Sequence, residues 1–360
     1  MALSKEQILA QLRTVNDPEL HRDIVTLNMV KNVAYCDGVA AIRIELTTPA
    51  CPLREQIQHE VEAAVRALGP EVKEVRIEWS AKVAPSPQRE AGQSNPLPGV
   101  KQIVAVGAGK GGVGKSTIAV NLAVGLARAG AAVGLLDGDI YGPSAPTLLG
   151  LHGLQLRGGA DFITPFEVHG IKAMTIGAMV GADKPLIWRG PMAHAAFRDL
   201  AVKTAWGDLD YLVIDLPPGT GDVPLTMAQT LPLAGAVIVC TPQRVARDDA
   251  RRAVAMFQQL DVAVLGVVEN MSYFIGDDGK EYDIFGRGGA EEMARELALP
   301  FLGAVPINMD LRANSDAGDP TANFTGAAKL AGALLDMVQK TAAQISVQAQ
   351  SAGLPTLSVS

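Results

Sequence analysis

Short apolar runs recur along most of the chain and alternate with segments of helical periodicity. After residue 100 these runs lie at residues 103–106, 133–136, 212–214, 236–239 and 264–268. Intervening segments, such as 118–127 and 247–260, place apolar residues at helical spacing. Continuous apolar strands separated by helices are typical of a parallel sheet with helices on both faces. We therefore predict an α/β domain with a mostly parallel sheet over residues 100–345.

The first 79 residues have a different pattern, which predicts a small α+β domain. The expected order is a helix at residues 4–14, strands at 30–35 and 39–46, a helix at 52–68 and a strand at 72–78. Ser4 is a typical helix cap, and Asp37-Gly38 between two strands is a typical hairpin turn. A domain of this size has only a modest core of its own.

Two stretches show neither the helical nor the strand periodicity of apolar residues. Residues 80–99 hold four prolines among small polar residues, so we expect a partly extended linker that lets the domains move relative to each other. Residues 346–360 are rich in Gln, Ser and Ala, and we expect a disordered tail there.

Composition bounds the compartment and the partners. The chain has 360 residues, of which 48% are hydrophobic, and a net charge of −7. No apolar run reaches the roughly 18 residues of a membrane span, and the N-terminus does not have the pattern of a signal peptide. We therefore expect a cytoplasmic protein without a membrane partner. The acidic balance disfavours nucleic-acid binding, which needs a basic face.

Residues 107–117, GAGKGGVGKST, carry the strongest functional signal. They follow the apolar run at 103–106 and precede the predicted helix at 118–127. A glycine-rich turn between a strand and a helix, ending in Lys-Ser, is the phosphate-binding loop (P-loop). Its backbone N–H groups and the helix N-terminus favour phosphate. The predicted nucleotide-binding residues are Gly109, Lys110, Gly111, Gly112, Val113, Gly114, Lys115, Ser116 and Thr117.

Within this loop, Lys115 is expected to reach the β- and γ-phosphates and Ser116 to ligate Mg²⁺. A P-loop does not require the second lysine, Lys110. Gly107, Gly109 and Gly112 also fit the G-x-G-x-x-G pattern of dinucleotide folds. That alternative leaves Lys115 and Ser116 unexplained.

Polar residues that follow other predicted strands complete the expected site. Asp137 and Asp139 come after the run at 133–136, where one could contact Mg²⁺ and the other could orient water; a solvated turn is the alternative. Asp215 ends the run at 212–214, the expected place for a Mg²⁺ carboxylate. Asn270 follows the run at 264–268 and has the donor and acceptor to read an adenine edge; an ordinary turn Asn is the alternative.

These motifs resemble a known family. The loop with Lys110 resembles the deviant P-loop of the MinD/ParA/nitrogenase-iron-protein class. Residues 137–144 (DGDIYGPS), 215–222 (DLPPGTGD) and 269–272 (ENMS) resemble the Mrp/ApbC family of iron–sulfur cluster carrier ATPases. Residues 17–20 (DPEL) and 46–52 (LTTPACP) resemble the small N-terminal domain that bacterial Mrp proteins carry.

The resemblance implies an ATP-hydrolysing carrier that loads iron–sulfur clusters onto apo-proteins, with ATP and Mg²⁺ as cofactors. It implies catalytic roles for Lys110, Lys115 and Asp139, and Mg²⁺ contacts for Ser116, Asp137 and Asp215. In this class the extra lysine, which corresponds to Lys110, reaches across a homodimer to the nucleotide of the other subunit. Apo iron–sulfur proteins and assembly factors are the implied partners.

The chain departs from this family at one point. The family commonly carries a Cys-x-x-Cys pair shortly after the ENMS element, whereas residues 273–280 (YFIGDDGK) contain no cysteine. Thiolates are the usual ligands of such clusters. Among Cys36, Cys51 and Cys240, we favour Cys51, which precedes a predicted helix whose N-terminus favours thiolate. Cys240 ends an apolar strand and is expected to be a buried hydrophobe.

Two other functions remain open from the sequence. A nucleotide-switch adaptor would need no cluster of its own. A MinD/ParA-like positioning ATPase would need a basic amphipathic helix or a basic surface. The predicted C-terminal helix at 327–344 contains only Lys329 and Lys340 as basic residues, which disfavours the membrane-bound version.

Overall fold

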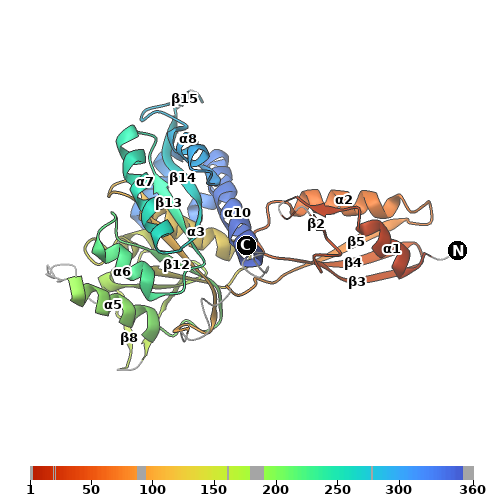
Figure 1. The fold of residues 1–360 in the computed structure, drawn as a ribbon, viewed down its shortest axis with the longest axis horizontal. Helices are drawn as coiled ribbons and strands as arrows, with labels where there is room; N and C mark the ends of the chain where they lie inside the picture. The colour runs from red at the N-terminus through yellow and green to blue at the C-terminus, as the bar shows by residue number, and fades with distance from the viewer. Residues whose placement is uncertain are drawn as a thin grey trace, which may run out of the picture. The chain divides into compact units, whose positions relative to one another are not determined.

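The computed structural model describes residues 3–18, 20, 22–86, 95–159, 162–178, 190–276 and 279–351. The chain divides into two compact units, Met1–Ala84 and Pro85–Ser360. Figure 1 draws both units. Among the described residues, no helix combines the length and apolar character needed to cross a membrane.

The smaller unit is the expected α+β domain. Its elements are α1 (Lys5–Leu12), β1 (Asn16–Asp17), β2 (Arg22–Asp23), β3 (Val30–Cys36), β4 (Val39–Leu46), α2 (Arg54–Arg66) and β5 (Glu74–Ala81). Strand β4 pairs antiparallel with β3 and parallel with β5. Ser4 caps α1 in a capping box with Gln7, and Asp37 and Gly38 turn the hairpin with positive φ angles. Ile42, Ile44 and Ile57 are among its fully buried core residues.

The larger unit is the expected α/β domain, built on a nine-stranded sheet in the described residues. The central strands are β6 (Val100–Gly107), β7 (Val133–Asp137), β11 (Ile171–Thr175), β12 (Leu209–Asp215), β13 (Gly235–Cys240), β14 (Val264–Ile275) and β16 (Phe301–Ile307). They are parallel in the order β11-β7-β12-β6-β13-β14-β16. Two short antiparallel strands, β10 (Phe166–Val168) and β15 (Glu281–Tyr282), extend it, and β8 (Arg157–Gly158) pairs with β9 (Ile163–Thr164).

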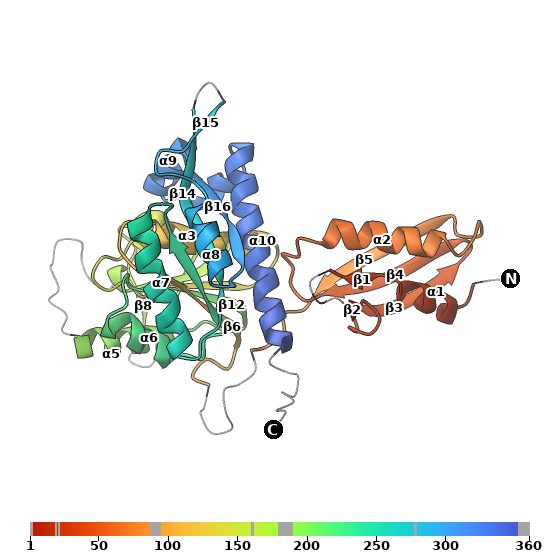
Figure 2. The same cartoon turned by 45° about the horizontal axis from the view of Figure 1, so that its top comes forward.

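Helices cover both faces of this sheet (Figure 2). One layer contains α5 (Gly190–Lys203), α6 (Asp222–Thr230), α7 (Arg244–Gln259) and α8 (Gly289–Glu296). The opposite layer contains α3 (Lys115–Arg128) and α10 (Ala328–Ser351), which pack on each other. The remaining helical elements are α4 (Ala145–Leu148), η1 (Ile176–Ala178), α9 (Met309–Ala317) and η2 (Pro320–Phe324).

The structure corrects two boundaries. Helix α10 continues to Ser351, so a disordered tail does not begin at residue 346: Ile345 and Ser346 are buried against the domain, and the Ser346 hydroxyl donates to Ala342 O. The expected linker at 80–99 is ordered at both ends. Strand β5 reaches Ala81, and Leu97 is buried in the core of the larger unit. Residues 87–94 and 352–360 lie outside the described residues.

Candidate functional site

The P-loop joins β6 to α3 in a conformation that its glycines permit. Gly112 and Gly114 have φ angles of 81° and 80°, in the left-handed region that favours glycine. Gly114 is the N-cap of α3, and neither a capping side chain nor an acidic first-turn residue occupies that helix terminus. A Cβ on Gly109 would overlap the backbone of α7 at Asp249. The loop is therefore fixed close to α7, while the N–H groups of the first α3 turn remain available to an anion.

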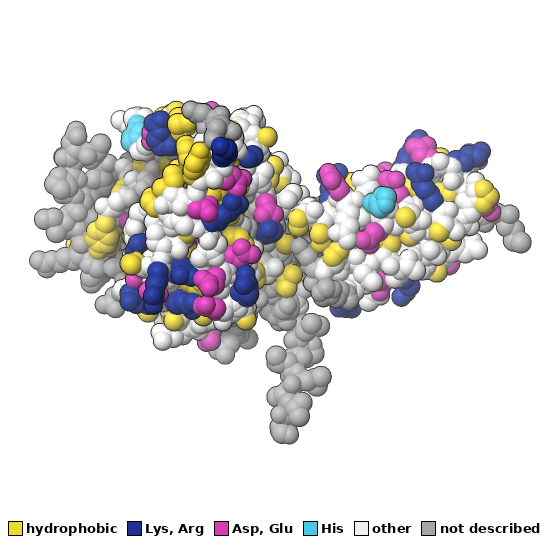
Figure 3. Space-filling model, turned by 90° about the horizontal axis from the view of Figure 1, so that it is seen from above, with side chains coloured by type: hydrophobic (Ala, Val, Ile, Leu, Met, Phe, Trp, Pro, Cys, Tyr) yellow, Lys and Arg dark blue, Asp and Glu magenta, His cyan; other side chains and the backbone are white. Residues whose placement is uncertain are grey.

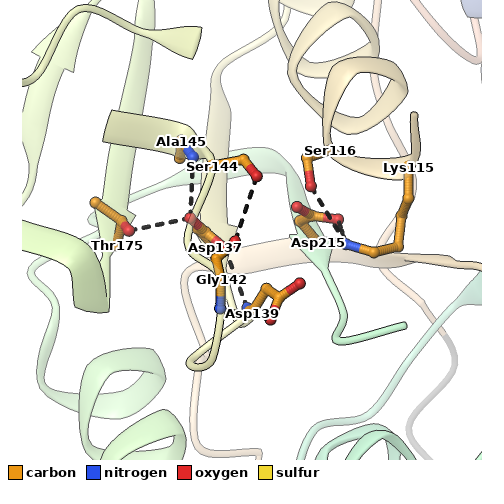
Figure 4. Close-up of polar contacts among 9 residues, drawn as sticks. All are labelled: Lys115, Ser116, Asp137, Asp139, Gly142, Ser144, Ala145, Thr175 and Asp215. Carbon is orange, nitrogen blue, oxygen red and sulfur yellow. Dashed lines mark hydrogen bonds and ion pairs between the residues drawn. The ribbon is translucent and has the colours of Figure 1, made fainter. Parts of the chain in front are cut away.

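Lys115 and Asp215 meet at the floor of this site (Figure 4). Lys115 Nζ donates to Asp215 Oδ1, and it lies 3.4 Å from Ser116 Oγ. The Lys115 and Asp215 side chains are only 6% and 4% exposed. Each charge would be costly to bury alone, so the pair exists because each neutralises the other.

Asp137 lies beside Asp215, because β7 and β12 pair with these two residues in register. Asp137 Oδ1 accepts from Asp139 N at 3.1 Å; its Oδ2 accepts from Ala145 N and Thr175 Oγ1, both at 3.1 Å. Burial, together with the charge of Asp215, raises the pKa of Asp137 to about 7. Burial also raises the pKa of Asp215, against the opposing effect of Lys115. Two buried carboxyls with one lysine form a site that a cation would stabilise.

The remaining predicted residues lie around this centre. Asp139 is half-buried, and its Oδ1 accepts from Gly142 N at 3.2 Å. Lys110 is half-buried, and none of the described side chains pairs with its ammonium. The structure thus groups Lys115, Ser116, Asp137, Asp139 and Asp215 at the carboxyl ends of β6, β7 and β12.

Asn270 does not lie in a turn, which was the alternative to its predicted role at the adenine base. Strand β14 does not end at residue 268 but continues to Ile275, so Asn270 lies within it. The side chain is 4% exposed, and its Nδ2 donates to Val113 O of the P-loop at 2.9 Å. A role in reading adenine stays a prediction. The observed contact braces the loop.

Sequence reasoning assigned no role to two other buried residues, Thr175 and Glu269. Thr175 donates to Asp137 from the end of β11, a strand that was not predicted. Glu269 is fully buried, and its carboxylate accepts from Gly288 N and Ala290 N at the start of α8. The signal for Glu269 was an acidic residue directly after an apolar run, the same signal that indicated Asp137 and Asp215.

The three cysteines lie in unlike environments, and all are thiols. Cys36 is exposed, and its hydrogen bond to Asp37 raises its pKa. Cys240 is buried as expected, and burial raises its pKa to about 12. Cys51 is half-buried beside the core of the smaller unit; α2 begins at Arg54, later than expected, so Cys51 lies outside its first turn. No cluster of three or more His, Cys, Asp or Glu suited to a metal occurs among the described residues.

The family assignment follows from comparison with known proteins. A curated protein of Synechocystis sp. named iron–sulfur cluster carrier protein is 47% identical over 354 residues, covering 96% of this chain and 99% of its own. The chain belongs to the iron–sulfur cluster carrier family. A carrier protein of Escherichia coli is 38% identical, covering 95% of this chain and 92% of its own.

Family models that match the two parts of the chain support this assignment. Residues 99–342 match the model described as NUBPL iron-transfer P-loop NTPase, and residues 5–78 match that of an iron–sulfur cluster assembly protein. A nucleotide-binding protein from Archaeoglobus fulgidus, solved in complex with ADP, is 41% identical with a TM-score of 0.56. It covers 62% of this chain and 88% of its own. The cell division ATPase MinD of Pyrococcus furiosus, 20% identical with a TM-score of 0.50 over 66% of this chain and 97% of its own, shares the fold.

Proposed function

We propose that this chain is an ATP-hydrolysing carrier that loads iron–sulfur clusters onto apo-proteins in the cytoplasm. The observation that carries the proposal is the P-loop, whose Lys115 is buried against Asp215 beside a second carboxyl, Asp137. This arrangement occurs in a chain of the carrier family, and a 41% identical relative was solved with ADP.

The residues at the P-loop fit a nucleotide with Mg²⁺. The uncapped α3 terminus supplies N–H donors suited to phosphate. Lys115 would exchange Asp215 for the β- and γ-phosphates, and Ser116, Asp137 and Asp215 would hold the metal. Mg²⁺ prefers a few carboxylates together with phosphate oxygens. When bound, it would neutralise charge on the phosphates, and it would also offset the repulsion between the two buried carboxyls.

Hydrolysis would then depend on two further side chains. Asp139 would orient the attacking water, since it lies beside Asp137 and is not engaged in a buried ion pair. Lys110 would act in trans across a homodimer, because Lys115 already supplies the cation of its own loop. Asn270 would hold the loop in place and contact the base.

The cluster is the cargo of this reaction, and Cys51 is the thiol that we favour as its ligand. The segment at 273–280 lacks the family's cysteine pair, so a cluster would need Cys51, non-cysteine ligands or thiols of a partner. Cys240 is a poor candidate because burial disfavours its thiolate. The same absence supports a second candidate function, a nucleotide-switch adaptor that recruits other assembly factors.

Anaerobic reconstitution of the full chain tests the cargo. Iron and sulfide are counted and the absorption spectrum is recorded for the wild type, Cys51→Ser and Cys240→Ala. We expect the wild type to bind a cluster, Cys51→Ser to lose most of the bound iron, and Cys240→Ala to retain it. Full iron content in Cys51→Ser would remove this thiol from the account. Wild-type protein without iron would support the adaptor.

A further inference from the structure

Glu269 and Asn270 are consecutive buried residues of β14 whose side chains serve opposite faces of the sheet. Successive side chains of a strand alternate between its faces. Glu269 reaches the layer that contains α8, whereas Asn270 reaches the P-loop, which leads into α3 in the other layer. One dipeptide therefore contacts both the start of α8 and the P-loop.

On the α8 side, the Glu269 carboxylate accepts hydrogen bonds from both ends of the segment 272–288. Its Oε1 accepts from Ser272 Oγ at 2.5 Å and from Gly288 N at 2.8 Å, and its Oε2 accepts from Ala290 N at 2.7 Å. Residues 273–287, which include β15, lie between Ser272 and Gly288 in sequence. Gly288, the N-cap of α8, brings no side chain of its own, and Glu269 accepts from the backbone N–H groups there, in addition to the acidic residues Glu291 and Glu292 of the first turn.

On the P-loop side, Asn270 leaves the loop little freedom. Its Nδ2 donates to Val113 O, and a Cβ on the next residue, Gly114, would overlap that same nitrogen. Directly after Asn270 the strand is irregular: Met271 has a φ of 55°, and the pairing with β16 shifts between Asn270 and Phe274. The position of Asn270 is therefore not fixed by a regular ladder on its C-terminal side.

We propose that Glu269 is a positioning residue for the nucleotide site. By fixing β14 to the start of α8 at the point where the strand becomes irregular, it sets the position of Asn270. Asn270 in turn sets the Val113–Gly114 peptide at the N-terminus of α3. This inference rests on the proposed nucleotide site and assigns that site a residue on the far face of the sheet.

A helix cap without such coupling would show a different response to mutation. Glu269→Gln keeps the shape of the side chain, but its amide NH₂ replaces one carboxylate oxygen and cannot accept, so either Gly288 N or Ala290 N loses its acceptor. A plain cap would lose stability and leave nucleotide affinity unchanged. A positioning residue would lose affinity, and would lose it only while Asn270 is present to transmit the shift.

Equilibrium binding of fluorescently labelled ADP to the full chain separates the two. We expect Glu269→Gln to weaken binding about tenfold, as for a buried polar group left without its partner. In an Asn270→Ala background the same substitution should cause no further loss. Met293→Ala, which removes a buried side chain of α8 without touching the carboxylate, is the matched control and should keep wild-type affinity.

Thermal melting run in parallel shows whether each variant folds. If Glu269→Gln does not fold, Ser272→Ala removes only the 2.5 Å bond to the carboxylate and should weaken ADP binding to a smaller degree. Unchanged affinity in a folded Glu269→Gln or in Ser272→Ala, or losses that add in the double variant, would overturn the inference. The readout is ADP affinity alone, so it is separate from the hydrolysis and cluster measurements that test the proposed function.

Discussion

Lys115 contributes both to the stability of the site, through its ion pair with Asp215, and to the proposed chemistry. We expect Lys115→Ala to lower ATP hydrolysis about 100-fold or more, because the phosphates lose a positioned cation. Phosphate release measures this. Lys101→Ala is the matched control: Lys101 lies on β6, the strand that leads into the P-loop, is 41% exposed and pairs with Asp210, and its removal should leave the rate unchanged. Equal rates for Lys115→Ala and the wild type would refute the site.

Asp137 makes the stability of the nucleotide-free protein depend on pH. Its pKa of about 7 in the folded state exceeds the value of about 3.9 expected when unfolded. Between these values the folded state holds the extra proton, so the contribution of Asp137 to the free energy of unfolding falls as pH rises from about 4 to 7 and is constant above.

Chemical denaturation of the wild type and Asp137→Asn between pH 4 and pH 8 isolates this contribution. Carboxyls that do not interact with Asp137 affect both proteins equally, so the difference between the two curves belongs to Asp137 and the carboxyl coupled to it, Asp215. We expect the variant to gain stability relative to the wild type as pH rises. Parallel curves over the whole range would contradict the raised pKa.

At the scale of elements, helix α10 is longer than its sequence suggests, and its last turns are packed. Ile345 is 1% exposed. A chain ending at Ser351, which keeps the whole of α10, is the reference. A chain ending at Gln344 should lose about 2 kcal/mol or more, as for deletion of a large buried aliphatic group. Equal melting temperatures for the two truncated chains would contradict this packing.

Apolar runs predicted the central strands well, but elements that break the apolar pattern were missed. Strand β14 continues through Glu269 and Asn270 because partners distant in sequence satisfy these polar side chains, and through Ser272 because its hydroxyl donates to Glu269. Strand β16 contains Pro306, which is tolerated because β16 pairs on one side, with β14, in the described sheet. Such partners cannot be read from local periodicity.

The residues of the candidate site likewise divide into those that the sequence could predict and those that it could not. The P-loop was predictable because its glycines and lysine encode a local conformation. Asp137 and Asp215 were predictable because each ends an apolar run. Thr175 and Glu269 were not, since their importance lies in hydrogen bonds to groups brought near by the sheet.

At the scale of the whole molecule, the net charge of −7 disfavours a nucleic-acid surface. On the face drawn in Figure 3, basic and acidic side chains are interspersed. Charged side chains also pair between elements of the larger unit, as in Arg247–Glu292 between α7 and α8. The role that we propose for Lys110 requires a second copy of the chain as its partner.

Mixing inactive variants tests the dimer. A Lys110→Ala subunit retains its own Lys115 and would receive Lys110 from a Lys115→Ala partner, which completes one site. An equimolar mixture should therefore recover about a quarter of the wild-type hydrolysis rate, since half of the dimers are mixed and each has one complete site of two. A mixture that stays inactive would place Lys110 in its own subunit's site.

The most direct test of the central claim is cluster transfer from the reconstituted full chain to an apo-ferredoxin, followed anaerobically with and without Mg²⁺ and ATP. The account predicts that ATP changes the transfer rate of the wild type and has no effect on Lys115→Ala loaded with the same amount of iron. The account would be contradicted if the wild-type protein hydrolysed ATP but transferred its cluster at the same rate with and without ATP.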